Sequence, residues 1–174
     1  YYLGLNRPWP GAGADNLFSP REVGYSHLMR GELFTHRWLD GVYDEDSEHP
    51  NRYAYDVVTD LDLHQDPNLL EGYKTVIVNG HSEYWSAEAF EGLDQYLAAG
   101  GTAIIMSGNT FFWRTSFSDD SSVMECRKYD ARIGGRRSAE MGETWHSQDG
   151  HRGSLMRECG FPEYETFGLS CIGW

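Results

Sequence analysis

Three residues of the types that take part in hydrolytic chemistry follow two apolar runs of this chain. The run at residues 75–78 leads into His81 and Glu83, and the run at 102–106 leads into Asn109. An imidazole transfers protons, and a carboxylate beside it orients it or shares a metal ion with it. A carboxamide can hold a carbonyl oxygen or an oxyanion. These residue types predict hydrolysis at a carbonyl group, provided that the three side chains meet.

The two apolar runs are predicted to be buried parallel strands joined by a helix. Both are rich in β-branched residues, and both are too short for a helix. Between them, residues 87–98 have apolar side chains at helical spacing behind Ser86, a typical capping residue, and a Gly-Gly pair ends the segment. In a right-handed strand-helix-strand unit both strands end at one edge of the sheet, where open α/β sheets bind ligands. We therefore expect His81, Glu83 and Asn109 to lie together.

The rest of the chain predicts further strands around this unit. We predict them at residues 1–5, 55–60, 123–128 and 167–174, and the first and third of these segments have alternating patterns. Apolar pairs four residues apart predict a helix over 26–40. This order of elements favours a three-layer α/β sandwich with a mostly parallel sheet. We expect residues 1–174 to form a single α/β domain and, because the sequence starts in mid-structure without an initiator methionine, a fragment of a longer chain.

Charge and composition narrow the range of partners and compartments. The formal net charge of −13 argues against a nucleic-acid backbone or an anionic membrane surface as a partner. No apolar stretch approaches the roughly 20 residues that a membrane span needs, and there is no signal peptide. The three cysteines have no CxxC spacing, which is typical of reduced thiols. These features favour a cytoplasmic protein.

Other catalytic patterns have less support in the sequence. No G-x-S-x-G elbow, Walker loop or G-x-G-x-x-G motif is present. His146 and His151 are five residues apart with no evident second ligand pair, so a structural or solvated role is favoured. A metal-free hydrolase that uses His81 and Ser82 stays an alternative. A non-enzymatic recognition surface built from the aromatic residues 85 and 111–113 is another.

Four segments of the sequence together resemble a known family. They are YDVVTDLDLH, EGYKTVIVNGHSEYWS, GGTAIIMSGNTFFWR and, more loosely, GETWHSQDGHRGSLMRECG. They are similar to the large (beta) subunit of N,N-dimethylformamidase and its relatives. The resemblance implies a class I glutamine-amidotransferase-like (flavodoxin-like) core that lacks the usual cysteine. It also implies a mononuclear ferric iron held by two tyrosines and one glutamate, and hydrolysis of a small amide to an amine and a carboxylate.

The resemblance also implies roles for individual residues. The glutamate ligand of the iron corresponds to Glu83, and the catalytic residues correspond to His81 and Asn109. One tyrosine ligand corresponds to Tyr25 by local context, with Tyr2 as a rival. The second tyrosine is expected before residue 1, and a further catalytic glutamate after residue 174. The implied partners are a small amide substrate, a small subunit and further copies of the chain. The alternative is a catalytically inactive domain that binds a ligand or assembles subunits.

Overall fold

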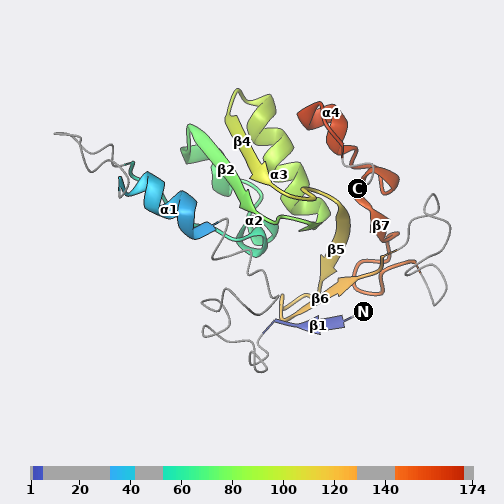
Figure 1. Cartoon of the computed structure of the whole chain (residues 1–174). Helices are drawn as coiled ribbons and strands as arrows, with labels where there is room; N and C mark the ends of the chain where they lie inside the picture. The colour runs from blue at the N-terminus through green and yellow to red at the C-terminus, as the bar shows by residue number, and fades with distance from the viewer. Residues whose placement is uncertain (1, 6–31, 42–52, 129–143, 171–174) are drawn as a thin grey trace, which may run out of the picture.

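The computed structural model describes residues 2–5, 32–41, 53–128 and 144–170 (Figure 1). The described elements, in chain order, are β1 (Tyr2–Gly4), α1 (Leu33–Leu39), α2 (Asp60–Gln65), η3 (Leu69–Gly72), β2 (Thr75–Gly80), β3 (Tyr84–Trp85), α3 (Ala87–Ala98), β4 (Thr102–Ser107), β5 (Trp113–Phe117), β6 (Val123–Cys126), β7 (Ser154–Leu155), η5 (Met156–Glu158) and α4 (Glu163–Phe167). None of the helices in these ranges is long and apolar enough to cross a membrane.

The predicted strand-helix-strand unit is confirmed in β2, α3 and β4, but the predicted burial of both strands is wrong, because Val78 is their only buried residue. Strands β2 and β4 pair in parallel from Thr75 opposite Thr102 to Gly80 opposite Ser107. Helix α3 lies against one face of this two-stranded sheet (Figure 1). It begins after Ser86, whose hydroxyl accepts a hydrogen bond from the Ala89 amide at 3.2 Å. The cap and the apolar spacing therefore define this helix as the sequence indicated.

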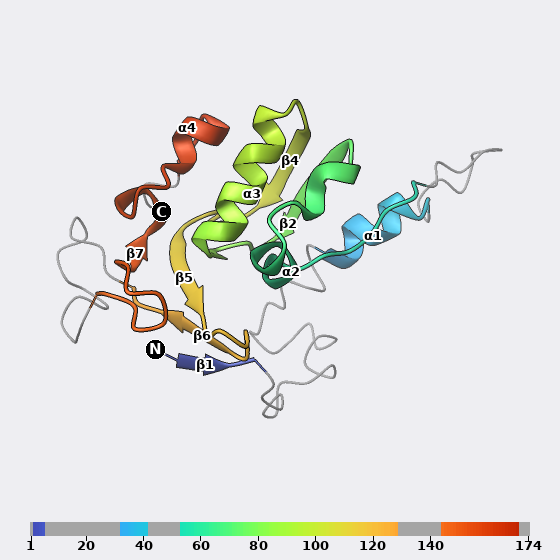
Figure 2. The same ribbon diagram turned by 180° about the vertical axis from the view of Figure 1, so that it is seen from behind.

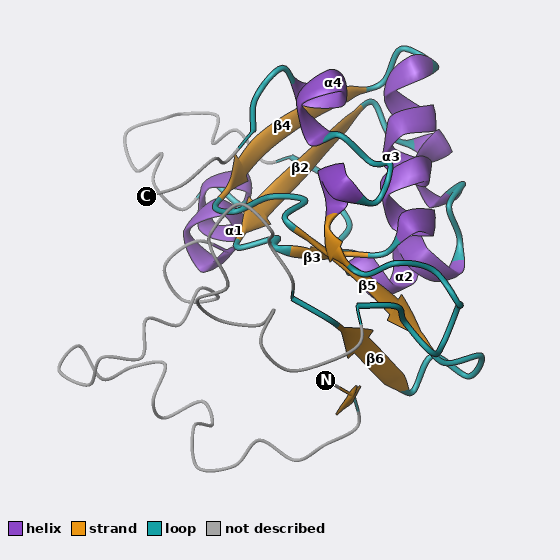
Figure 3. Ribbon diagram, turned by 90° about the vertical axis from the view of Figure 1, so that its right-hand side faces the viewer, coloured by secondary structure: helices purple, strands orange, loops and turns teal. Residues whose placement is uncertain are grey.

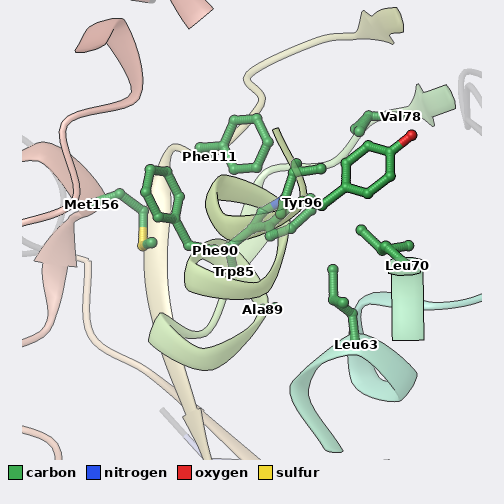
Figure 4. Packing of buried hydrophobic residues seen from close by; sticks show 10 residues of the cluster. Leu63, Leu70, Val78, Trp85, Ala89, Phe90, Tyr96, Phe111 and Met156 are labelled. Carbon is green, nitrogen blue, oxygen red and sulfur yellow. The ribbon is translucent and has the colours of Figure 1, made fainter. Parts of the chain in front are cut away.

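A hydrophobic core holds α3 between the sheet and the last described elements. Figure 4 shows its members gathered around the helix, with Phe90 and Met156 on one side and Leu63 and Leu70 on the other. Phe111, which follows β4, stacks on Phe167 of α4 with 4.5 Å between ring centroids. Burial of a large apolar side chain contributes about 1.5–3 kcal/mol. The core thus fixes the segment that follows β4, and this segment contributes to the site described below.

A second sheet overturns the expected three-layer sandwich with a mostly parallel, glutamine-amidotransferase-like sheet. Its strand order is β1-β6-β5-β3, with β7 also paired to β5. The β1–β6, β5–β6 and β5–β7 pairs are antiparallel, and only β3–β5 is parallel. After β4 the chain leaves the first sheet through Asn109 and Phe111, which both have left-handed backbone conformations (φ 49° and 56°). Strand β5 then runs away from β4 toward β6 and β1 (Figures 1 and 2).

On the side of the two parallel strands away from α3, the described residues place only α1, beside the end of β2 (Figures 1 and 2). Side chains alternate between the two faces of a strand, and Val76 and Val78 of β2 belong to the core on the α3 side. Ile104 and Met106 of β4 therefore point away from α3, and they are 41% and 44% exposed. Figure 3 shows α2 and α3 together on one side of the two parallel strands.

The other predicted elements have mixed outcomes. The strand expected at 55–60 is wrong, because the described residues 53–59 form no strand and Thr59 and Asp62 make a capping box that begins α2 at Asp60. Strands β1 and β6 confirm the predictions near residues 1–5 and 123–128. Of the helix expected over 26–40, the described part is α1. The strand expected at 167–174 is wrong over its described part, since α4 extends to Phe167 and residues 171–174 lie outside the described ranges.

Candidate active site

The loops that follow β2 and β4 are hydrogen-bonded to each other. The Ser82 amide donates to Ser107 Oγ at 2.7 Å, and the Phe111 amide donates to the Ser82 carbonyl oxygen at 3.1 Å. The Gly108 amide lies 3.3 Å from the Gly80 carbonyl oxygen that accepts its hydrogen bond. The two strand ends therefore meet at one edge, as the parallel unit predicted.

His81 and Glu83 form a contact at this edge. His81 Nε2 lies 3.1 Å from Glu83 Oε2, and the two side chains are 26% and 14% exposed. An ionised carboxylate only accepts hydrogen bonds, so Nε2 carries the hydrogen in this contact. The other ring nitrogen is Nδ1. On that side the ring lies against Gly108, where a Cβ atom would come within 3.0 Å of Nδ1.

Asn109 follows Gly108 directly and thus belongs to the loop that contacts His81. Its left-handed backbone, with φ of 49°, is a conformation that asparagine adopts more readily than most residues. The structure therefore brings the segment of Asn109 to the His81 ring. A role for its carboxamide as an oxyanion donor stays a prediction.

The second oxygen of the Glu83 carboxylate contacts residues that the sequence did not indicate as functional. The indole Nε1–H of Trp113 donates to Glu83 Oε1 at 2.9 Å. The Lys128 ammonium lies 3.9 Å from the same oxygen and donates a hydrogen bond to the Tyr84 hydroxyl. Burial raises the pKa of the Tyr84 phenol above its ordinary value, against the opposing effect of the Lys128 ammonium. No sequence pattern links Lys128, 45 positions after Glu83, to this carboxylate.

The tyrosines implied as iron ligands lie elsewhere or outside the described ranges. Tyr25 is outside them. Tyr2 is in β1, and its hydroxyl contacts Arg127 Nη2 at 3.1 Å and also Ser147 Oγ. Strand β1 is three positions from β3 in the sheet order, which corresponds to roughly 14 Å at the usual strand spacing. The structure therefore does not bring Tyr2 to Glu83.

The described residues match one part of the implied iron site. Glu83 supplies a hard, partly exposed oxygen donor of the kind that suits a ferric ion, with an imidazole beside it. Within the described ranges there is no group of three or more His, Cys, Asp and Glu residues placed to hold a metal ion. Glu83 thus fits the carboxylate position, and the described residues near it supply no tyrosinate with it.

A separate buried polar cluster joins β5 to the residues around His146. The His146 ring is 1% exposed, and its Nδ1 lies 2.7 Å from Ser116 Oγ. Arg114 forms an ion pair with Asp149 and donates to the Arg152 carbonyl oxygen at 3.3 Å. Burial, together with the nearby Arg114 charge, lowers the pKa of His146 to about 4. The structural role predicted for His146 fits this buried position, where it packs against β5.

The aromatic residues proposed as a recognition surface are buried. Trp85, Phe111, Phe112 and Trp113 all belong to the two hydrophobic clusters of the described residues. Ser82, the alternative nucleophile, accepts a hydrogen bond from the Trp85 indole at its hydroxyl oxygen, 2.8 Å away. The expectation of an exposed aromatic surface is therefore wrong.

Comparison with known proteins places the chain in a family. A family model described as "N,N-dimethylformamidase beta subunit-like, C-terminal" matches residues 1–173, so the chain belongs to this family. Similar curated relatives are the "N,N-dimethylformamidase beta subunit" of Alcaligenes sp. and that of Paracoccus aminophilus, each 34% identical over 110 residues. The matched part is 62% of this chain and only 14% of the length of each relative.

Proposed function

We propose that this chain contributes His81, Glu83 and Asn109 to an iron-dependent hydrolase of small, formamide-like amides. The observation that carries the proposal is the contact of 3.1 Å between His81 Nε2 and Glu83 Oε2, at the edge where the loop of Asn109 contacts the same imidazole. Membership of a family named after N,N-dimethylformamidase supports amide hydrolysis as the reaction.

Each of the proposed site residues has its own role in the reaction. Glu83, with Tyr25, is the proposed ligand set from this chain for a ferric ion, which when bound would polarise the substrate carbonyl and lower the pKa of a water molecule. Glu83 also orients the imidazole of His81, which accepts the proton of the attacking water and passes it to the leaving amine. Asn109 donates to the oxygen that becomes negative as water adds to the carbonyl. The products are an amine and a carboxylate.

We also propose that the protein works in an assembly. Its curated relatives are named as beta subunits, which supports a second kind of subunit as a partner. We propose further that the assembly contains more than one copy of this chain and that it is located in the cytoplasm. Because the matched part is 14% of the length of those relatives, the assembly is to be tested on the protein at its full natural length.

The test uses Glu83→Ala with a matched control. Glu88 also contacts a histidine, with its Oε2 3.2 Å from His64 Nδ1, but it lies in the first turn of α3. We expect the wild-type protein to bind iron, to show a visible tyrosinate-to-iron absorption band and to hydrolyse N,N-dimethylformamide. Glu83→Ala is expected to abolish all three properties, while Glu88→Ala retains them.

Three results would count against the proposal. One is a colourless, iron-free wild-type protein without hydrolytic activity, which leaves subunit assembly as the function. The second is a Glu83→Ala variant with unchanged turnover. The third is activity that resists chelators and is lost in Ser82→Ala, since that result favours the metal-free alternative.

A further inference from the structure

We propose that Trp113 is a positioning residue that fixes the Glu83 carboxylate for its role beside His81. Its indole N–H holds Oε1, so that Oε2 is presented to the imidazole. This inference rests on the proposed function, and it assigns to that function a residue that does not itself touch the substrate.

The first argument is that Trp113 holds both the main chain and the side chain of Glu83. Its backbone amide donates to the Glu83 carbonyl oxygen at 2.8 Å, and the Phe112 amide donates to the same oxygen at 3.1 Å. Its indole Nε1–H donates to Glu83 Oε1 at 2.9 Å. A single residue thus restrains the backbone of Glu83 and the rotation of its carboxylate.

The second argument is that the Trp113 ring is itself buried and packed on several sides. The residue is 9% exposed and begins β5, which pairs with β3 on one side and with β7 on the other. Its ring packs edge-to-face with Phe112, with 4.9 Å between centroids. The Lys128 ammonium lies 5.5 Å from the ring centroid. This packing therefore restrains the orientation of the indole, whose N–H points at Glu83.

The third argument concerns the two oxygens of the carboxylate. A carboxylate rotates freely about its last bond unless one oxygen is bound, and here Trp113 binds Oε1 while His81 contacts Oε2. Lys128 lies 3.9 Å from Oε1, beyond hydrogen-bond distance, so it adds charge but little orientation. Groups that orient a metal-binding carboxylate in this way typically change metal affinity or activity by about 10–100-fold when they are removed.

The experiment compares two Trp→Phe variants of the full-length protein. Trp113→Phe keeps an aromatic ring and removes the donor to Glu83. Trp85→Phe also removes a buried indole donor in the same region, but that donor bonds the Ser82 carbonyl and hydroxyl oxygens, at 3.0 and 2.8 Å, and no carboxylate. Iron affinity is measured by competition with a chelator. The constants kcat and KM are measured with N,N-dimethylformamide as the substrate. Stability is measured as the urea midpoint of the iron-free protein.

We expect Trp113→Phe to lower iron affinity and kcat about tenfold or more, with KM changed by less than about threefold. Both variants are expected to lower the urea midpoint by similar amounts, because each loses a buried hydrogen bond. In Trp85→Phe, however, iron affinity is expected to change by less than about threefold. Equal losses of iron affinity in the two variants would overturn the proposal, because they would reflect general loosening of the loop.

A double-mutant cycle tests the contact without any metal. The urea midpoints of iron-free Glu83→Ala, Trp113→Phe and the double variant are compared with the wild type. We expect the double variant to lose less than the sum of the single losses, since each change removes the same hydrogen bond. Strictly additive losses would contradict the contact on which the proposal depends.

The outcomes separate this proposal from the proposed function. If the wild-type protein binds iron and hydrolyses the amide, but Trp113→Phe changes neither property, only the positioning role fails. If the wild-type protein does neither, the proposed function fails and the role of Trp113 in it fails as well.

Discussion

Protonation of buried His146 is expected to destabilise the protein between pH 6.5 and pH 4. Burial lowers the pKa of His146 in the folded chain to about 4, from the ordinary value of 6.5 that applies when the chain unfolds. Within this window the unfolded chain binds a proton that the folded chain does not, so the free energy of unfolding falls as the pH falls. Each pH unit corresponds to about 1.4 kcal/mol. The loss is therefore about 2 kcal/mol at pH 5 and about 3 kcal/mol at pH 4.

The assay is urea denaturation of wild-type protein, His146→Gln and His151→Gln at several pH values from 7 to 5. His151 is exposed and serves as the matched control, because the fold imposes no comparable burial on it. The free energy of unfolding is expected to fall with decreasing pH equally steeply in the wild type and in His151→Gln. In His146→Gln it is expected to depend much less on pH. An unchanged slope in His146→Gln would refute the reasoning, and so would an NMR titration that places the pKa of His146 near 6.5.

Three further predictions follow from local geometry. A Gly108→Ala variant is expected to lower kcat several-fold with little loss of stability. The new Cβ would lie 3.0 Å from His81 Nδ1 and displace the ring by a few tenths of an ångström. An unchanged kcat would contradict this prediction. Thr59→Ala is expected to lower the free energy of unfolding by about 1 kcal/mol, measured with urea, since it removes the hydroxyl that accepts from the Asp62 amide at 3.2 Å; an unchanged midpoint would show that the cap is not formed. Burial raises the pKa of Cys126 to about 11, so peptide mapping after iodoacetamide treatment at pH 8 is expected to find Cys126 labelled only in denaturant, and rapid labelling of native protein would argue against its burial.

The sequence alone was sufficient to predict the elements whose signals are local. The β-branched runs predicted β2 and β4, and the apolar spacing behind Ser86 predicted α3. The position of His81 and Glu83 just after the predicted strand also predicted that their side chains meet, and they lie 3.1 Å apart. Each of these features depends on residues within about a dozen positions, where spacing and capping carry the information.

The wrong fold class shows where local patterns stop. The strand-helix-strand unit favoured a mostly parallel sandwich, but the chain turns away from it at Asn109 and Phe111. Left-handed backbone at Phe111 has no signal in the sequence, because bulky residues rarely adopt it. The stacking of Phe111 on Phe167, 56 positions later, is one of the contacts that hold it there.

The tertiary structure also decided which polar residues are buried and which aromatic residue serves the site. Arg114 and Ser116 of β5 have no apolar pattern, and their burial depends on His146 and Asp149, some thirty positions away. In the sequence Trp113 is one of several neighbouring aromatic residues. The pairing of β5 with β3 is what directs its indole at Glu83. A sequence pattern indicates which face a residue prefers. The partner that satisfies a buried donor or charge is set by strand pairing between distant segments, and spacing along the chain does not encode it.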